Sequence, residues 1–313
     1  MTLPAGTITG TADITALVQT AYDQYVRMAL RSIPVMRAIA DVKPVQQAMP
    51  GSSVVFSIYS DLSQVTATLT EESDASSVAL GNPSQVTVTL NEYGSAVTTT
   101  KKLNLTSFND VDAALADIIA YNAADSIDAV VAAVLTGGTN VIYGGNATTT
   151  NTIDSADTIS VADIRNAVTE LRTNKALPRL GELYAAYLHP RQAADLRAES
   201  GTGGFQDIVK YTDNVSKTII PGSVGVIEGA FVVETPRVPF AANTNSPAVN
   251  VYKAVVAGRE ALAEAMGQDI NTVIGPEIDA LRRFRTIGWY YFGGFARLRE
   301  AALYRIETSA SAG

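Results

Sequence analysis

The residue types that usually carry catalysis are scarce in this chain. His189, in the run LHPRQ, is the only histidine, so the two-histidine HExxH zinc motif cannot occur. A histidine at the end of an expected strand could act as a general base, but a histidine before a helix-starting proline more commonly has a structural role. The chain has no cysteine, which removes thiolate nucleophiles, disulfides and sulfur-ligated zinc. We therefore expect no metal site and assign no catalytic role to His189.

Three further patterns match functional motifs only in part. Asp110 and Asp112 could form a metal or acid–base pair, but they also fit the first turn of a helix, where carboxylates face the positive end of the helix dipole. Around Ser223, proline occupies the first glycine position of the nucleophile-elbow motif. The glycine-rich runs at 138–145 and 201–204 lack the residues of phosphate-binding or dinucleotide-binding loops. The sequence thus predicts no catalytic residue, no cofactor-binding residue and no cofactor.

The chain as a whole is acidic. Its 31 Asp and Glu against 23 Lys and Arg give a formal net charge of −8, which repels phosphate backbones. Residues 282–307 reverse this sign, with six arginines against two glutamates, and aromatic residues lie among them. Such a pattern suits single-stranded nucleic acid, but a half-buried strand with arginines on its solvent face gives the same sequence. We expect no sequence-specific binding to nucleic acid.

The composition favours burial of surface against partners. Hydrophobic residues make up 47% and charged residues 17%, below the roughly 25% charge typical of soluble proteins. Contacts between subunits would explain this, and so would a large core in a monomer. The N-terminus has no basic segment followed by a long apolar one, and no stretch of about 18 residues is wholly apolar. We therefore expect a soluble protein made in the cytoplasm, with no membrane segment.

The first part of the chain changes from helical to β periodicity and back. Residues 13–40 have apolar side chains at helical spacing until Pro34 interrupts them, and they fit either an arm or a packed first helix. From 51 to about 100, alternating Val, Thr and Leu predict a long hairpin that includes a strand at 63–70. A long helix follows at 110–136, and its charged residues are all aspartates. Its predicted buried stripe consists of Val111, Leu115, Ile118, Ile119, Ile127, Val130, Val131 and Val134.

The hairpin is acidic throughout. No lysine or arginine lies between Pro44 and Thr100. A two-stranded ribbon rich in Thr and Ser is marginal on its own in water, so it needs a docking partner, which could be another subunit. Its carboxylates are Asp61, Glu71, Glu72, Asp74 and Glu92.

Beyond residue 138 helix and strand patterns alternate. Ser160 and Asp163 predict a capping box that opens a helix. A strand at 182–189 leads into a helix at 190–199, and a short helix is expected near 205–211. The remaining chain is mostly β, with segments at 219–238, 250–258 and near the C-terminus. These patterns predict an α+β fold.

The order of these parts resembles the major capsid proteins of tailed bacteriophages, which have the Hong Kong 97-like fold. The runs YAAYLHPRQAADL, VGVIEGAFVVETPRVP and AVVAGREALAEA add to the resemblance, which covers nearly the whole chain. It implies an N-terminal arm, an extended hairpin called the E-loop, a spine helix, a peripheral P-domain and an axial A-domain. The implied boundaries are 1–48 for the arm, 51–102 for the E-loop, 103–179 with 266–313 for the P-domain including the spine helix 110–136, and 180–265 for the A-domain.

The resemblance implies a structural function without an enzymatic step. Subunits of that family form hexamers and pentamers that close into an icosahedral shell around double-stranded DNA, in the head of the virion. The implied partners are copies of the chain itself, with scaffold, portal and decoration proteins as further candidates. An encapsulin-type nanocompartment shell, a β-rich phage tail or adhesin protein, and an enzyme with an unrecognised carboxylate site are the alternatives.

The charges suggest one contact within such a shell. We expect the acidic hairpin of one subunit to lie across the arginine-rich strands of a neighbour, where opposite charges set the register. Two family features are unmatched: no lysine for an E-loop cross-link lies between Lys43 and Lys101, and no long charged segment precedes Asp13, so we expect a separate scaffold protein or none. The residues of the expected contact are Asp61, Glu71, Glu72 and Asp74 on one side and Arg282, Arg283 and Arg285 on the other.

Overall fold

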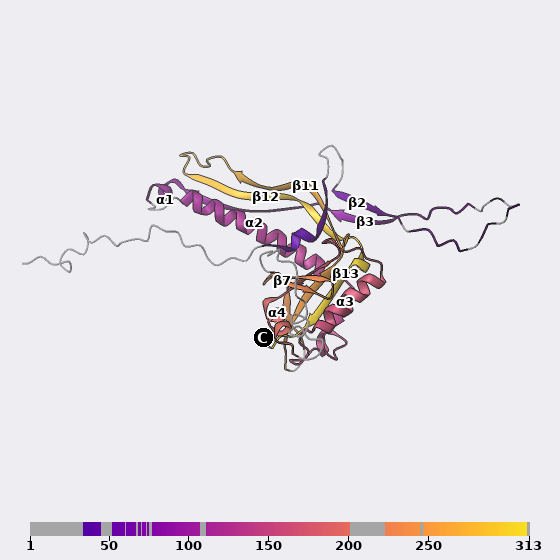
Figure 1. Ribbon diagram of the computed structural model, residues 1–313. Coiled ribbons are helices and arrows are strands. Elements are labelled where there is room, and N and C mark those ends of the chain that lie inside the picture. Colours follow the sequence, from indigo (N-terminus) through magenta and orange to yellow (C-terminus); the bar gives the residue numbers. More distant parts are fainter. Residues whose placement is uncertain are drawn as a thin grey trace, which may run out of the picture.

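The computed structural model describes residues 34–44, 52–200 and 223–311, apart from residues 60, 67, 70, 73, 75–76, 107–110 and 245–246. The described chain is elongated. A long helix and a narrow sheet form its upper part, a lobe lies below them, and a ribbon extends to the right (Figure 1). The short helix expected at 205–211 and most of the helix expected at 13–40 lie outside the described residues.

The upper part is a four-stranded sheet with a long helix along one face. The strand order is β1 (Ala40–Pro44), β11 (Leu262–Ile274), β12 (Phe284–Arg297) and β4 (Asn91–Thr100). β1 runs parallel to β11, and the other neighbours are antiparallel. Helix α2 (Val111–Thr136) lies along this sheet (Figure 1). Because side chains alternate along β12, Ile287, Trp289 and Tyr291 turn together toward α2 and pack against it.

The described part of α2 matches the predicted helix, which ends before Gly137 and Gly138. In the predicted stripe Ile119, Ile127 and Val131 are buried, but Ile118 is 44% exposed, so that member of the stripe is wrong. Successive helical residues point about 100° apart, and a single packed face holds only one of this adjacent pair. Residues 115–136 are long and apolar enough to cross a membrane, but α2 packs against the sheet and the lower lobe.

The lower lobe is built on a seven-stranded sheet. Helix α3 (Val161–Thr173) covers one face through Ile164, Val168 and Leu171. The predicted capping box is present, because Ser160 accepts a hydrogen bond from the Asp163 amide. Helix α4 (Pro190–Ala198) follows β6 as predicted. The strands in spatial order are β5 (Val141–Tyr143), β13 (Leu303–Thr308), β10 (Asn250–Ala257), β6 (Tyr184–Leu188), β8 (Ala230–Glu234) and β7 (Ser223–Ile227), and β9 (Phe240–Ala242) pairs with β10.

The ribbon consists of β2 (Ser53–Ile58) and β3 (Ser84–Thr89), which pair antiparallel. Beyond these strands the described residues of 61–69 and 77–83 form no strand. The strand predicted at 63–70 is therefore absent from the described part of the single chain. The reason is a missing partner, since a strand needs a neighbour for its backbone hydrogen bonds.

The root of the ribbon is seated on the upper sheet. Val88 and Leu90 are buried there against Ala265 of β11. Gly294 of β12 lies directly beneath, and a Cβ on this glycine would overlap the carbonyl oxygen of Thr89. The ribbon can approach the sheet this closely only because that position has no side chain.

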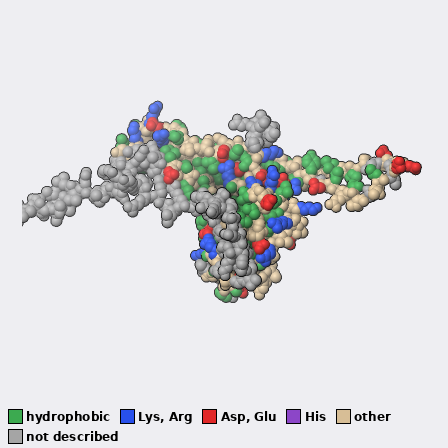
Figure 2. Space-filling view, in the orientation of Figure 1, with side chains coloured by type: hydrophobic (Ala, Val, Ile, Leu, Met, Phe, Trp, Pro, Cys, Tyr) green, Lys and Arg blue, Asp and Glu red, His purple; other side chains and the backbone are tan. Residues whose placement is uncertain are grey.

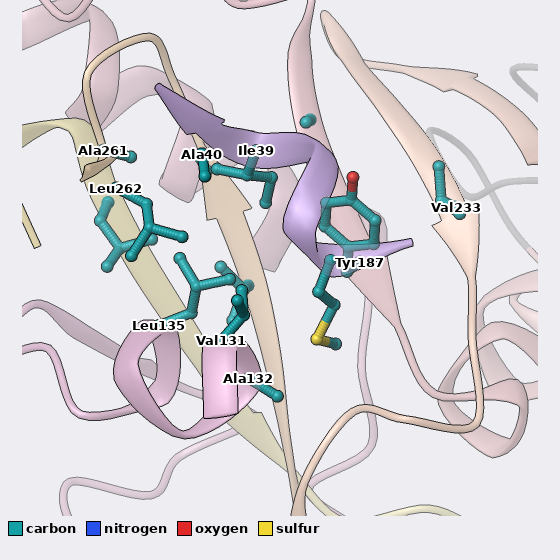
Figure 3. Packing of buried hydrophobic residues seen from close by; sticks show 14 of the residues in the cluster. Ile39, Ala40, Val131, Ala132, Leu135, Tyr187, Val233, Ala261 and Leu262 are labelled. Atoms are coloured by element: carbon teal, nitrogen blue, oxygen red, sulfur yellow. The ribbon is translucent and has the colours of Figure 1, made fainter. Parts of the chain in front are cut away.

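The described residues after Pro34 form the 3₁₀ turn η2 (Met36–Ile39) and then β1, without continuing an α-helix. Ile39 and Ala40 point into a buried cluster with Val131 and Leu135 of α2 and with Leu262 of β11 (Figure 3). This cluster joins the start of the described chain to both the upper part and the lower lobe. The remaining short elements are α1 (Lys101–Thr106), η3 (Thr150–Thr152) and η4 (Glu300–Ala302).

Candidate subunit interface

The outer half of the ribbon exposes a row of apolar side chains. Leu62, Val65, Leu69, Val78 and Leu80 are between 58% and 80% exposed. Burial of such surface contributes roughly 25 cal/mol per Å². A single exposed leucine is ordinary, but a row along one narrow projection indicates a contact surface.

The predicted carboxylates of the ribbon are exposed, and they form two groups. Glu71, Glu72 and Asp74 lie at its far end, which Figure 2 shows as an acidic tip. Asp61 lies nearer the root, where it lines a pocket of about 330 Å³ together with Lys175. Because the ribbon has no lysine or arginine between Lys43 and Lys101, no basic residue of its own neutralises the tip.

The predicted arginines lie at the opposite end of the molecule, where β11 turns into β12 (Figure 1). Arg283 forms an ion pair with Asp279 at 2.6 Å, and its guanidinium lies 5.4 Å from the centroid of the Phe284 ring. Arg282 is exposed, with a left-handed backbone φ of 51°. The amide of Lys101 donates to the Arg283 carbonyl at 2.8 Å, which brings the lysines that begin α1 to the same place. We call this group the basic end: Lys101, Lys102, Arg282, Arg283 and Arg285.

The acidic tip and the basic end are far apart within one chain. The structure brings the three predicted arginines together, and it brings three of the four predicted carboxylates together, but it does not join the two groups (Figures 1 and 2). An attraction between them therefore has to act between two copies.

A shallow apolar groove lies between these two ends, on the upper sheet. It has a volume of about 370 Å³ and is lined by β4, β11 and β12. Thr286, Gly288 and Tyr290 contribute to it from β12, and these are the positions that alternate with the side chains packed on α2. The groove is thus on the sheet face away from the helix, where Val273 at 46% exposure adds apolar surface.

The other arginines of the C-terminal stretch have partners within the chain. Arg297 donates to the Val134 carbonyl at 3.0 Å, and Arg305 donates to the carbonyls of Thr136 and Gly138. These arginines cap the C-terminus of α2, where cations offset the helix dipole. Arg299 pairs with Glu260 at 2.8 Å. The positive run at 282–307 is therefore divided between a capping role and the basic end.

A buried carboxylate that the sequence did not reveal holds the start of the described chain. Asp128 of α2 is 1% exposed and accepts hydrogen bonds from the backbone amides of Val35, Met36 and Arg37. Burial raises the pKa of Asp128, while these three amides act in the opposite direction because they favour the charged form. The hydroxyl of Tyr187 donates to the Val35 carbonyl at 3.3 Å, and burial beside Asp128 raises its pKa to about 12.

A second buried carboxylate ties the same segment to the upper sheet. Arg37 donates to both oxygens of Glu264, at 2.6 Å and 3.1 Å, and Glu264 is fully buried. The Tyr291 hydroxyl donates to Glu264 at 2.9 Å, and burial together with this negative neighbour raises the pKa of Tyr291. Asp269 adds an ion pair to Arg37 at 3.0 Å. The direction in which the chain enters the body is thus fixed by paired charges.

Among the residues considered for catalysis, His189 has a structural role, and the side chains of the others lie outside the described residues. His189 caps α4: its Nδ1 accepts from the Arg191 amide at 3.2 Å, and its ring lies 4.6 Å from that of Tyr252. Burial and the charge of Arg191 lower the pKa of His189. No group of three metal-ligating side chains occurs within the described residues. The side chains of Asp110, Asp112 and Ser223 and the run 201–204 lie outside them.

The sequence matches the model of the family described as phage capsid protein over residues 8–311. No curated protein matches it.

Solved capsid structures share the fold. The capsid of Ralstonia phage GP4 gives a TM-score of 0.74 at 16% identity, covering 98% of each chain. The cyanophage Pam1 capsid gives 0.71 at 14% identity, over 96% of this chain and 98% of that one. The capsid of cyanophage P-SCSP1u gives 0.69 at 17% identity, over 99% and 97%. The α+β fold of the Hong Kong 97-like type expected from the sequence is confirmed.

Proposed function

The chain belongs to the phage capsid protein family and is a major capsid protein of the head shell, and we propose that its copies join head to tail, the ribbon of one crossing the upper sheet of the next. The opposed positions of the acidic tip and the basic end carry this proposal. A contact between two different ends of identical chains generates a ring when the rotation closes. Hexamers and pentamers are the rings we propose, arranged as an icosahedral shell around double-stranded DNA.

Apolar burial supplies the strength of the proposed contact. The ribbon offers exposed Leu62, Val65 and Leu69, and the sheet offers the groove beside Val273 and Tyr290. Neither surface is covered by described residues of its own chain. Since each subunit has one ribbon and one groove, every copy in a ring can use both.

Charge sets the register of the same contact. Glu71, Glu72 and Asp74 of one copy would lie at the basic end of the next, where Arg282, Arg283 and Arg285 are gathered. Exposed ion pairs contribute only about 0.2–1 kcal/mol each, so their main effect is on alignment and encounter, and it weakens with salt. The net negative charge of the chain repels the phosphates of the enclosed DNA, so the shell would hold DNA without binding it tightly.

The domain boundaries proposed from the resemblance need one adjustment on physical grounds. The lower lobe corresponds to the A-domain proposed at 180–265, but its sheet also contains β5 and β13 from outside that range. We propose that these strands and α3 belong to the same folding unit, because they share its buried core. The E-loop corresponds to the ribbon, and the spine helix to α2.

Charge reversal tests the registering contact. Changing Arg282, Arg283 and Arg285 together to Glu should strongly reduce the yield of shells, scored by negative-stain electron microscopy and size-exclusion chromatography. Changing Glu71, Glu72 and Asp74 together to Arg should do the same. Mixing the two variant subunits pairs the reversed ends and should restore part of the assembly.

A matched control separates this contact from a general effect of charge. Arg165 of α3 is exposed and pairs with Glu228 in the lower lobe, so Arg165→Glu changes surface charge away from the basic end. It should leave assembly unchanged. Full assembly of the triple arginine variant, or no restoration on mixing, would refute the pairing.

A further inference from the structure

A seven-residue run occurs twice in the ribbon. Residues 63–69 read SQVTATL and residues 84–90 read SQVTVTL, so the runs differ only where Ala67 replaces Val88. Both alternate threonine with apolar residues, and their intrinsic preference for a strand is nearly the same. The two runs should therefore adopt the same conformation wherever each has a partner strand.

The two runs have different surroundings in the single chain. The run 84–90 forms β3, pairs with β2 and buries Leu90, which is 7% exposed. The described residues of 63–69 form no strand, and Leu69, the counterpart of Leu90, is 77% exposed. Val65 is 80% exposed. A strand-forming sequence whose backbone and apolar side chains both lack partners within the described chain points to a partner outside it.

An unpaired sheet edge of suitable length lies elsewhere in the molecule. β4 pairs with β12 on one side, and no other described strand pairs with it on the other. The strand has ten residues, and Ser95, Ala96, Val97 and Thr98 are exposed. It contains no proline, no lysine and no register shift, which are the devices that commonly protect an edge.

We propose that residues 63–69 of one copy add as a strand to the free edge of β4 in a second copy. The proposal rests on the function proposed above, because the added strand is part of the ribbon that crosses the neighbouring sheet. A second copy is the occupant because the chain assembles with copies of itself, and every copy carries both the run 63–69 and the β4 edge. The groove borders this edge at Gly94, Ser95 and Ala96, so an added strand lays its apolar side chains beside apolar surface.

The charged residues that follow each strand favour one direction for the added strand. The run 63–69 leads into the acidic residues Glu71 and Glu72, and β4 leads into Lys101 and Lys102. A parallel arrangement brings these opposite charges together, whereas an antiparallel one places the acidic tip near Glu92. The same sheet already contains a parallel pair, β1 with β11, at its other edge. The added strand therefore runs parallel to β4.

Amide hydrogen exchange of free subunits and of assembled shells tests the proposal. Exchange in 63–69, and at those amides of 91–100 that do not bond to β12, should slow by about 100-fold on assembly, because both gain backbone hydrogen bonds. The run 84–90 is the internal control, since its pairing with β2 already protects it in the free subunit. Shells in which 63–69 still exchanges as in the free subunit would overturn strand addition, and so would a β4 edge that is already protected before assembly.

Proline substitution at two adjacent positions provides a second test. Successive N–H groups of a strand point to opposite sides, so one of Val65→Pro and Thr66→Pro removes a ladder donor and the other a donor that faces away from β4. One variant should lower the shell yield about 10-fold more than the other, because it removes a backbone hydrogen bond between the added strand and β4. Equal yields in the two variants would refute this backbone pairing. Val65→Ser, which keeps the amide, reports the loss of apolar contact alone.

Disulfide trapping identifies the partner strand. The chain has no cysteine, so shells made from a mixture of Val65→Cys subunits and subunits with one cysteine at each position of β4 in turn have a clean background. Paired positions on adjacent strands lie about 5 Å apart, close enough for a disulfide. A covalent dimer at one of these positions supports the proposal, and its absence at every position of β4 overturns it.

The charge contact and the strand addition can fail separately. If charge-reversed subunits still assemble while the amides of 63–69 are protected from exchange, the registering contact is wrong and strand addition stands.

Discussion

The carboxylate of Asp128 accepts a hydrogen bond from the amide of Met36 at 2.7 Å, although the two residues are 92 positions apart in the sequence. The same carboxylate also accepts from the amides of Val35 and Arg37. A side chain in the middle of the long helix thus acts as the cap of a short turn that begins the described chain. The link holds the entering segment to α2 by backbone atoms, so it does not depend on which side chains that segment carries.

Removal of the Asp128 carboxylate should destabilise the subunit strongly. Asp128→Ala leaves the buried amide of Met36 and the half-buried amides of Val35 and Arg37 without their acceptor, and we expect a loss of about 3 kcal/mol in the free energy of unfolding. Chemical denaturation of the unassembled subunit measures it. Asp117→Ala is the control on the same helix: Asp117 is exposed, so we expect a change of no more than about 0.5 kcal/mol. Similar losses in both variants would contradict the capping role of Asp128.

Arg305, one of the two arginines that cap α2, should contribute more to stability than the surface residue Arg299. Arg305 pairs at 2.8 Å with Glu307, which is 1% exposed, so Arg305→Met should cost about 3 kcal/mol by leaving a buried carboxylate without its cation. Adding Glu307→Gln should recover part of that stability. Arg299→Met breaks an ion pair whose members are 48% and 44% exposed, and it should change stability by less than about 1 kcal/mol. Thermal unfolding of the three variants would show whether this order holds.

The only histidine should give the subunit a simple pH dependence. Its pKa is lowered in the fold, so stability from neutral His189 is fully present above the ordinary value of 6.5 and is lost as pH falls through the lowered pKa. Protonation of Nδ1 also removes the acceptor that caps α4. His189→Asn supplies a cap that does not titrate in this range. Unfolding measured from pH 7 to pH 5 should show a fall that is smaller in the variant, and identical slopes would contradict this assignment.

A methyl group at Gly294 should displace the root of the ribbon. Its Cβ would overlap the carbonyl oxygen of Thr89, and overpacking of this kind costs about 1–3 kcal/mol. We expect Gly294→Ala to lower the shell yield strongly and the thermal stability of the subunit only slightly, because the displaced element is the ribbon that contacts the neighbour. Electron microscopy and thermal unfolding of Gly294→Ala beside the unchanged chain separate the two effects. A shell yield equal to that of the unchanged chain would contradict this role of Gly294.

Elements with a strong local signal could be predicted from the sequence. The described end of α2 agrees because two glycines stop it, and α3 and α4 begin where Ser160 and His189 offer caps. The acidic character of the ribbon follows from its carboxylates and from the absence of lysine and arginine between Pro44 and Thr100. Each of these features depends on residues that are neighbours in the chain.

Features that depend on distant residues could not be predicted. In the sequence, Asp128 is one of several aspartates that make α2 acidic. Nothing in the residues around it in the chain shows that the amides of Val35 and Met36 reach it. Arg297 and Arg305 lie in the same positive run as Arg283, and only the fold separates helix caps from exposed charge. The strand expected at 63–70 is a different case, since its sequence favours a strand for which the described chain provides no partner.

The seat of the ribbon on Gly294 has a mechanical consequence for a curved lattice. The ribbon meets the body through one small buried cluster, in which Val88 and Leu90 pack against Ala265, and the larger buried clusters of the body lie elsewhere. Copies that meet their neighbours at different angles can adjust at this small seat. The particle can then curve while the larger clusters of every subunit keep the same packing.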